Sequence, residues 1–475
     1  MSEAGGPAEP LYYRSARALR DAIAAGELSA VEVVEAHLER IEAVNPAVNA
    51  IVTLVPERAL EEAAAADAHA ARGERLGLLH GLPVAVKDLM DTAGIRTTYG
   101  SPIYADHLPA ADALIVQRLR AAGAIVVGKT NAPEFGAGSH TFNQVFGATR
   151  NPWDLGRSAG GSSGGAAAAL AAGMVPIADG SDLGGSVRNP ASFCNVVGLR
   201  PSPGRVASTR PGDGWEPMSL LGPMARSVDD AALLLAAIAG PDSRAPLALD
   251  EDPAPFAALR PRGLGDVRVA WSETVDGLPL EPEIGGVLTP ARERLERLGA
   301  EVVEVEPDLA GADLVFETFR SLEFFAGHGA DVGTNPELVK PEVRADVERG
   351  ESLSAAEIVT AAALRTELFR RVGGLLAEFD TLALPTVQVL PFPVEWRYPE
   401  EIAGVAMERY YTWMRSCTRI SATTLPALSV PAGFTATGLP VGLQLVGRHR
   451  GERDLLALAA SVEAALGASA RRPPL

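Results

Sequence analysis

The sequence predicts an α/β fold, in which one large, twisted, mixed and mostly parallel β-sheet carries helices on both faces. Apolar segments of strand length alternate with segments of helical periodicity along most of the chain, a pattern typical of parallel strands joined by crossover helices. With 475 residues, 47% of them hydrophobic, the chain can bury a large core. Because no internal repeat divides it, we expect a single domain over residues 1–475.

The N-terminal part, residues 1–75, is predicted to be helical. Ser29 and Glu32 have the spacing of a capping box, in which two side chains bind each other's backbone N–H groups. We therefore expect an amphipathic helix that starts after Ser29 and runs to about Val44, followed by an alanine-rich helix over 57–72.

Strands and helices then alternate through residues 76–210 and again through residues 263–475. In the first of these parts, strands are predicted at 82–86, 124–127 and 174–178, and helices at 113–121 and 165–172. In the second, strands are predicted at 267–271, 301–305, 381–384 and 441–446, and helices at 283–298 and 452–466. Between the two parts lies a stretch rich in Pro, Ala and Asp, residues 240–262, which we interpret as a linker or excursion.

The composition argues against several classes of partner. A net charge of −18 disfavours nucleic acid and anionic membrane surfaces, since both attract clustered Lys and Arg. The two cysteines form no CxxC motif and no Cys/His cluster, so we expect no disulfide framework, no metal and no other cofactor. Residues 1–10 lack the features of a secretory signal, and Gly or Pro interrupts both long uncharged stretches, 158–178 and 420–447. We expect a cytoplasmic monomer or homodimer that acts on a small molecule, with no nucleic-acid or membrane partner.

Two short motifs suggest other chemistry. Residues 123–130 match the phosphate-loop pattern GxxxxGK[ST], but the intervening residues are apolar and mostly β-branched, which favours a strand over a phosphate-binding loop. Residues 161–165 fit GxSxG, the nucleophile elbow of α/β-hydrolases, with Ser163 as the candidate nucleophile. That elbow needs an acidic residue and a histidine downstream. Only His328 and His449 remain, and nothing marks either as catalytic. A hydrolase of that type is the weaker alternative.

A different serine hydrolase is indicated by a lysine, Lys87, and by two serines in glycine-rich runs, Ser162 and Ser186. Lys87 ends an apolar strand, where burial would lower its pKa and allow it to act as a base. The alternative is a charged lysine paired with Asp88. The glycines before Ser186 would let consecutive N–H groups converge on one point, as an oxyanion hole requires.

These segments resemble the amidase signature family. The similarity is carried by the Gly/Ser-rich stretch 160–190 and by blocks elsewhere that together span most of the chain: residues 81–88, 128–135, 151–154, 197–201 and 425–433. The resemblance implies the amidase-signature fold and a hydrolase that cleaves C–N bonds of linear amides.

The resemblance also implies a role for individual residues. Ser186 would be the nucleophile, Ser162 the bridging serine and Lys87 the base, with a cis peptide bond at Gly161–Ser162. The expected oxyanion hole consists of the backbone N–H groups of Leu183, Gly184, Gly185 and Ser186. The expected supporting residues are Gly161, Ser163, Ser181, Asp182 and Arg188.

The substrate is predicted from two further segments. In the first, which would line the acyl-side pocket, Gly136, Ala137 and Gly138 are small and leave room for a bulky group. The second, residues 392–413, is aromatic and is either a pocket wall or core packing. Both favour hydrophobic or aryl amides, with anilides, carbamates and esters as related substrates. The alternatives are the catalytic subunit of a tRNA-dependent amidotransferase and a catalytically silent binding protein on the same scaffold.

Overall fold

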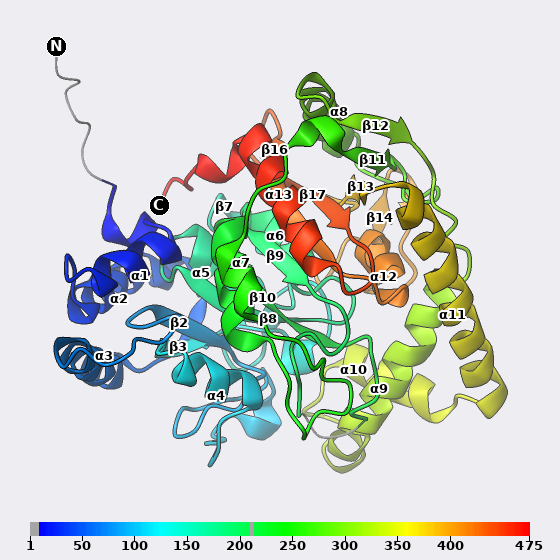
Figure 1. Cartoon of the computed structure of the whole chain (residues 1–475). Coiled ribbons are helices and arrows are strands. Elements are labelled where there is room, and N and C mark those ends of the chain that lie inside the picture. Colours follow the sequence, from blue (N-terminus) through cyan, green and yellow to red (C-terminus); the bar gives the residue numbers. More distant parts are fainter. Residues whose placement is uncertain (1–8, 210–212) are drawn as a thin grey trace.

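The structure is a computed structural model that describes residues 9–209 and 213–475. Residues 1–8, which belong to the N-terminal stretch without secretory-signal features, lie outside the described residues, as do residues 210–212. The centre of the described chain is an 11-stranded sheet in the order β1-β3-β2-β8-β10-β9-β16-β17-β13-β11-β12 (Figure 1). Its strands are β1 (Ile51–Leu54), β2 (Pro83–Lys87), β3 (Ile125–Thr130), β8 (Ile177–Asp182), β9 (Val197–Arg200), β10 (Leu220–Ala225), β11 (Arg268–Trp271), β12 (Glu301–Glu304), β13 (Thr381–Pro385), β16 (Ala427–Phe434) and β17 (Pro440–Val446).

Helices flank this sheet on both faces, as the fold class predicts, and the long helices α9, α10 and α11 lie together at the end of the molecule opposite α2 and α3 (Figure 1). The helices are α1 (Ala16–Ala24), α2 (Ala30–Val48), α3 (Pro56–Ala71), α4 (Leu114–Ala121), α5 (Gly164–Ala171), α6 (Arg188–Cys194), α7 (Val228–Ile238), α8 (Pro282–Arg297), α9 (Ala312–Thr334), α10 (Pro341–Glu351), α11 (Ala355–Glu378), α12 (Arg415–Ala422) and α13 (Glu452–Leu466). Three two-stranded ribbons complete the described strands: β4 (Phe142–Asn143) with β5 (Gly147–Ala148), β6 (Arg150–Asn151) with β7 (Asp154–Ser158), and β14 (Glu401–Ile402) with β15 (Val405–Ala406).

The sheet is mixed, but it is less parallel than the sequence predicts. Four of the ten neighbouring strand pairs among the described residues are parallel and six are antiparallel. Five of the six antiparallel pairs involve β1, β9, β10 or β16, four strands that the alternation of strand and helix does not predict, and the sixth joins β13 to β17. Crossover helices explain only the parallel pairs, so a pattern that relies on them overestimates parallel pairing.

Most predicted elements are confirmed within a few residues, and the capping box at Ser29 is present with both of its hydrogen bonds. The largest displacement concerns the strand predicted at 174–178, which is observed as β8 and begins three residues later. The stretch 240–262 contains a short 3₁₀ helix (Ala254–Ala258), and one sheet includes strands from both sides of this stretch. None of the helices in the described residues combines the length and apolar character that crossing a membrane would need.

The topology brings three candidate site segments to one edge of the sheet. β2 and β8 are adjacent and parallel, with Val84 opposite Ile177, so their carboxyl ends meet. Lys87 ends β2, while β8 leads into the loop that carries Ser186. The Gly/Ser-rich loop that precedes α5 reaches the same edge, because its Ser162 hydroxyl lies 2.8 Å from Lys87 Nζ.

Candidate active site

Lys87 lies at the centre of the candidate site and is completely buried. Its Nζ lies 2.8 Å from Ser162 Oγ, 2.8 Å from Ser163 Oγ and 3.0 Å from Ser181 Oγ. A neutral amine has two N–H donors and one lone pair, so three hydroxyl neighbours match its hydrogen-bonding capacity. The predicted alternative, an ion pair with Asp88, is not observed, because Asp88 accepts hydrogen bonds from the Thr98 N–H and hydroxyl groups.

The environment of Lys87 lowers its pKa enough to give a substantial neutral fraction near neutral pH. Burial lowers the pKa of Lys87 from 10.5 to about 7, although the charges of Asp179 and Asp182 oppose this shift. Burial disfavours an ammonium because it removes the water that would solvate the charge. A lysine in this state can accept a proton from a neighbouring hydroxyl group.

Ser162 follows a cis peptide bond, Gly161–Ser162, as the resemblance implies. Gly161 has no room for a side chain, since a Cβ atom there would lie 2.9 Å from Thr141 Oγ1. That hydroxyl is itself engaged, because it accepts a hydrogen bond of 3.1 Å from the Gly164 N–H. The loop therefore packs tightly around the position of Ser162.

The loop that carries Ser186 is organised by Asp182. Its carboxylate accepts hydrogen bonds from the Gly185 N–H at 2.8 Å and the Val187 N–H at 3.1 Å, which curl the chain around it. Arg188 pairs with the same carboxylate at 2.9 Å, and both side chains are buried. Burial acts to raise the pKa of Asp182, but the charges of Arg188 and Arg200 and these hydrogen bonds hold it well below its usual range.

Ser186 is more accessible than the other two candidate catalytic residues. It is 7% exposed, compared with 2% for Ser162 and 0% for Lys87. The carbonyl group of Ser186 accepts a 3.0 Å hydrogen bond from the Ser163 N–H, which joins the two serine-bearing loops. This gradient of exposure matches a nucleophile that meets a substrate while its base stays dry.

One of the four N–H groups of the expected oxyanion hole is engaged elsewhere in this structure. The Gly185 N–H is already bound to Asp182, so it cannot also face a substrate oxygen. The N–H groups of Leu183, Gly184 and Ser186 have no partner within residues 9–209 and 213–475. Gly185 is nevertheless required, because its φ is +106° and a Cβ atom there would lie 2.4 Å from that of Cys417.

The predicted acyl-side segment lies beside the serine loops. A Cβ atom on Gly136 would lie 3.6 Å from Ser162 Oγ, and one on Gly138 would lie 3.5 Å from the ring of Tyr410. The carbonyl group of Ala137, between them, accepts a hydrogen bond from Lys340 Nζ. The two glycines therefore add no side chain of their own between Ser162 and Tyr410.

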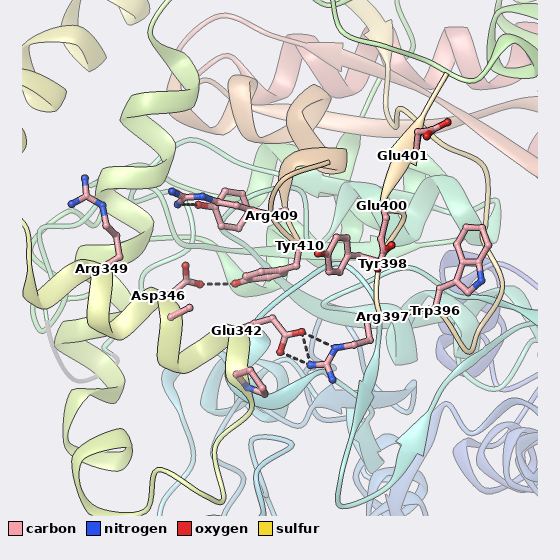
Figure 2. Close-up of a pocket in the computed structure, with 13 residues that line it drawn as sticks. Glu342, Asp346, Arg349, Trp396, Arg397, Tyr398, Glu400, Glu401, Arg409 and Tyr410 are labelled. Carbon is pink, nitrogen blue, oxygen red and sulfur yellow. Dashed lines mark hydrogen bonds and ion pairs between the residues drawn. The ribbon is translucent and has the colours of Figure 1, made fainter. Parts of the chain in front are cut away.

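Tyr410 also lines an open cavity of about 920 Å³ (Figure 2). One wall is α10 and the other is the aromatic segment. Figure 2 shows the two walls joined by a 2.5 Å hydrogen bond from the Tyr410 hydroxyl to Asp346 and by a pair between Arg397 and Glu342. Arg320, which is buried, also donates to the Tyr410 hydroxyl.

The structure divides the aromatic segment between the two predicted roles. Four of its aromatic residues line the cavity: Trp396, Tyr398, Tyr410 and Tyr411. Phe392 and Trp413 instead pack in the core, where their rings meet edge to face at 5.3 Å. The residues that line the cavity thus form a pocket wall, and Phe392 and Trp413 pack this segment against the core.

The two competing motifs do not assemble a site. Residues 125–130 form strand β3, so they cannot wrap around a phosphate group. His328 stacks on Phe135 and lies 3.5 Å from Asp331, whereas His449 packs against Phe369. Within the described residues, His, Cys, Asp and Glu side chains nowhere gather in threes as a metal site would need.

Sequence reasoning missed Asp179 as a neighbour of Lys87, and it placed Tyr410 in the aromatic segment without predicting its contact at Gly138. Asp179 is fully buried in β8 and accepts a 2.8 Å hydrogen bond from the Lys87 backbone N–H. Its place directly after the predicted apolar strand 174–178 was an available signal for it. Nothing in the sequence indicates that Tyr410 reaches the segment around Gly138.

Comparisons of the sequence and of the fold with known proteins agree on the family to which the chain is similar. A family model described as Amidase matches residues 32–456. The acylamidase of Rhodococcus erythropolis is 36% identical over 463 residues and 96% of each chain. One of the glutamyl-tRNA(Gln) amidotransferase subunits of Moorella thermoacetica is 40% identical over 98% of this chain and 99% of its own. Among solved structures, a bacterial aryl acylamidase of the amidase signature family superposes with a TM-score of 0.90 at 28% identity, over 98% of this chain and 100% of its own. The peptide amidase of Stenotrophomonas maltophilia superposes with a TM-score of 0.82 at 30% identity, over 98% and 99%.

Proposed function

This chain belongs to the amidase signature family of C–N hydrolases, and from that premise we propose that it is a stand-alone serine amidohydrolase for hydrophobic and aryl amides. The observation that carries the proposal is the 2.8 Å contact between Ser162 Oγ and the buried Nζ of Lys87. A base next to a hydroxyl is what activates a serine nucleophile.

The proposed reaction begins with a proton relay. Neutral Lys87 accepts the proton of Ser162, and Ser162 in turn takes the proton of Ser186 as its oxygen attacks the amide carbonyl. The N–H groups of Leu183, Gly184 and Ser186 then hold the negative oxygen of the tetrahedral intermediate. Asp182 and Arg188 keep the loop in the shape that presents these groups.

The relay runs backwards when the intermediate collapses. The protonated Lys87 returns its proton through Ser162 to the departing nitrogen, the C–N bond breaks, and an acyl group remains on Ser186. Water then attacks the acyl-enzyme with the same base and releases the acid. Carbamates and esters can follow the same steps, because they too present a carbonyl group with a leaving group.

The preference for hydrophobic and aryl groups is supported by the shape of the surroundings. Gly136, Ala137 and Gly138 leave space beside Ser162, and the aromatic wall of the cavity meets that segment at Tyr410. Flat aromatic groups gain both buried apolar area and ring contacts in such a setting. We therefore expect anilides to be better substrates than small free amides.

The test is the release of 4-nitroaniline from 4-nitroacetanilide by the purified chain alone, with Ser186→Ala as the control. We expect turnover that the substitution abolishes while the circular dichroism spectrum stays unchanged. Retained activity in the folded variant would remove Ser186 from its role. Light scattering on the same sample checks that the active species is a monomer or homodimer.

A second candidate function is the catalytic subunit of a tRNA-dependent amidotransferase, favoured by the 40% identity to the Moorella thermoacetica protein. Expression with a tag in the native host distinguishes the two. Stoichiometric co-purification of partner subunits, with glutamine hydrolysis only in their presence, would replace the stand-alone hydrolase by this candidate.

A further inference from the structure

Asp179 is a buried carboxylate beside the catalytic lysine that no step of the proposed reaction uses. It is fully buried in β8, next to the strand that ends in Lys87. Its Oδ1 accepts a 2.8 Å hydrogen bond from the Lys87 N–H, while its Oδ2 has no partner among residues 9–209 and 213–475. Burying a carboxylate costs folding free energy unless cations or hydrogen bonds compensate its charge. A carboxylate buried beside Lys87 with one oxygen unpartnered is therefore a candidate for a role in the reaction.

The neighbouring carboxylates are compensated by other groups. Asp182 pairs with Arg188 at 2.9 Å and lies 3.6 Å from Arg200, and both arginines are buried. Asp88 accepts hydrogen bonds from both the hydroxyl and the backbone N–H of Thr98. Asp179 differs because its cationic neighbours are two lysines, Lys87 itself and Lys129.

The other elements packed here contribute little charge. Strand β10 and helix α5 carry no ionisable side chain. The buried titratable residues of α2 and α7 are engaged elsewhere: His37 with the Val33 carbonyl group and Asp230 with the N–H groups of residues 16 and 17. Lys129 is bound by Met90, Thr92 and Thr97 and is influenced by Asp88, Asp91 and Asp112 as well as by Asp179.

We propose that Asp179 is a positioning residue of the reaction: its ionised carboxylate holds the backbone of Lys87 and sets the pH above which Lys87 acts as a base. The inference rests on the role of Lys87 in the proposed function. An opposite charge nearby favours the ammonium form of a lysine, whereas burial favours the amine. The negative charge of Asp179 thus keeps the basicity of a completely buried lysine from falling too far.

The electrostatics agree with the direction of this effect. Burial lowers the pKa of Lys87 to about 7, and among the opposing influences the charge of Asp179 comes first and that of Asp182 second. Burial also raises the pKa of Asp179, and the Lys87 N–H bond and the charges of Lys129 and Lys87 oppose that shift. Loss of the Asp179 charge would lower the pKa of Lys87 further. The enzyme would become active at lower pH, and its lysine would be a weaker base when neutral.

The experiment measures the rate of Ser186 labelling by a fluorophosphonate probe against pH, which needs no knowledge of the substrate. Asp179→Asn keeps an oxygen that accepts the Lys87 N–H bond but removes the charge. Asp230→Asn is the matched control, since Asp230 is also buried and also accepts backbone N–H bonds, at 3.0 Å from Ala16 and Arg17. Urea titration shows that each variant is folded.

We expect the acid limb of the wild-type profile to lie near pH 7 and that of Asp179→Asn to lie about one pH unit lower or more. The plateau rate of the variant should fall, and the limb of Asp230→Asn should not move. An unmoved limb in a folded, labelled Asp179→Asn variant would overturn this inference alone. A wild-type enzyme that is never labelled at Ser186 would overturn the proposed function, and this inference with it.

Discussion

Ser162 and Ser163 are adjacent hydroxyl residues, each 2.8 Å from Lys87 Nζ, yet their surroundings assign them different parts. Ser163 Oγ has a further acceptor, the Ser181 carbonyl group at 3.5 Å. It can donate a hydrogen bond to that group while it accepts one from the lysine. Ser162 has no such outlet among the described hydrogen bonds. We therefore expect Ser162 to carry the proton and Ser163 to orient the amine.

The two serines can be separated by single substitutions. Ser162→Ala should lower kcat/KM by about 10²–10⁴, the usual contribution of a positioned proton-transfer group. Ser163→Ala removes a contact of the same length but leaves the relay intact, so we expect a loss below about tenfold. Steady-state kinetics on 4-nitroacetanilide measures both. Equal losses in the two variants would contradict a relay through Ser162.

At the residue scale, sequence motifs are sufficient to identify the candidate residues but not all of their contacts. Lys87, Ser162 and Ser186 stand in recognisable motifs, and the structure brings Lys87 and Ser162 into contact. The hydrogen bond of Gly185 to Asp182 could not be predicted, because it depends on how the carboxylate turns back under its own loop. Tyr410 could not be predicted either, because it reaches Gly138 across a large sequence separation.

At the scale of elements, periodicity identifies strands and helices well but says little about pairing. The helix expected at 452–466 is observed with those bounds. Strands β9 and β16 were missed because glycine, proline and serine interrupt their apolar residues. Helices α9–α11 were missed as well, and with them the wall of α10 that faces the aromatic segment.

The aromatic segment makes a prediction at this scale, because its two tryptophans have different environments. Trp396 is 52% exposed and lines the cavity, whereas Trp413 is 1% exposed and packs against Phe392. Trp396→Ala should raise KM for aryl amides and leave the melting temperature unchanged. Trp413→Ala should cost about 3–5 kcal/mol of unfolding free energy through the cavity it creates. Kinetics with calorimetry on both variants tests the division, and a stable Trp413→Ala enzyme would contradict it.

At the scale of the whole molecule, Arg205 joins segments that are far apart in the chain. The guanidinium group lies 3.0 Å from Glu452 at the start of α13 and 2.7 Å from Glu251 within the stretch 240–262. Glu452 is completely buried and also accepts a 2.6 Å hydrogen bond from the Ser202 N–H. Arg205 thus connects the loop after β9 and the 240–262 stretch to the C-terminal helix.

This connection predicts a large difference in stability between the loss of Arg205 and the loss of its exposed partner Glu251. Arg205→Ala would leave the Glu452 carboxylate buried without its cation, which typically costs about 3–5 kcal/mol. Glu251→Gln removes a partner whose side chain is 50% exposed, and such surface pairs contribute about 0–1 kcal/mol. Urea unfolding followed by fluorescence and by residual hydrolase activity measures both. We expect the urea midpoint of Arg205→Ala to be much lower, with the same value by fluorescence and by activity. The lost contact lies between segments and not in the active site, so activity should disappear only when the whole fold does. Equal midpoints for the two variants would mean that the buried pair does not hold these segments together.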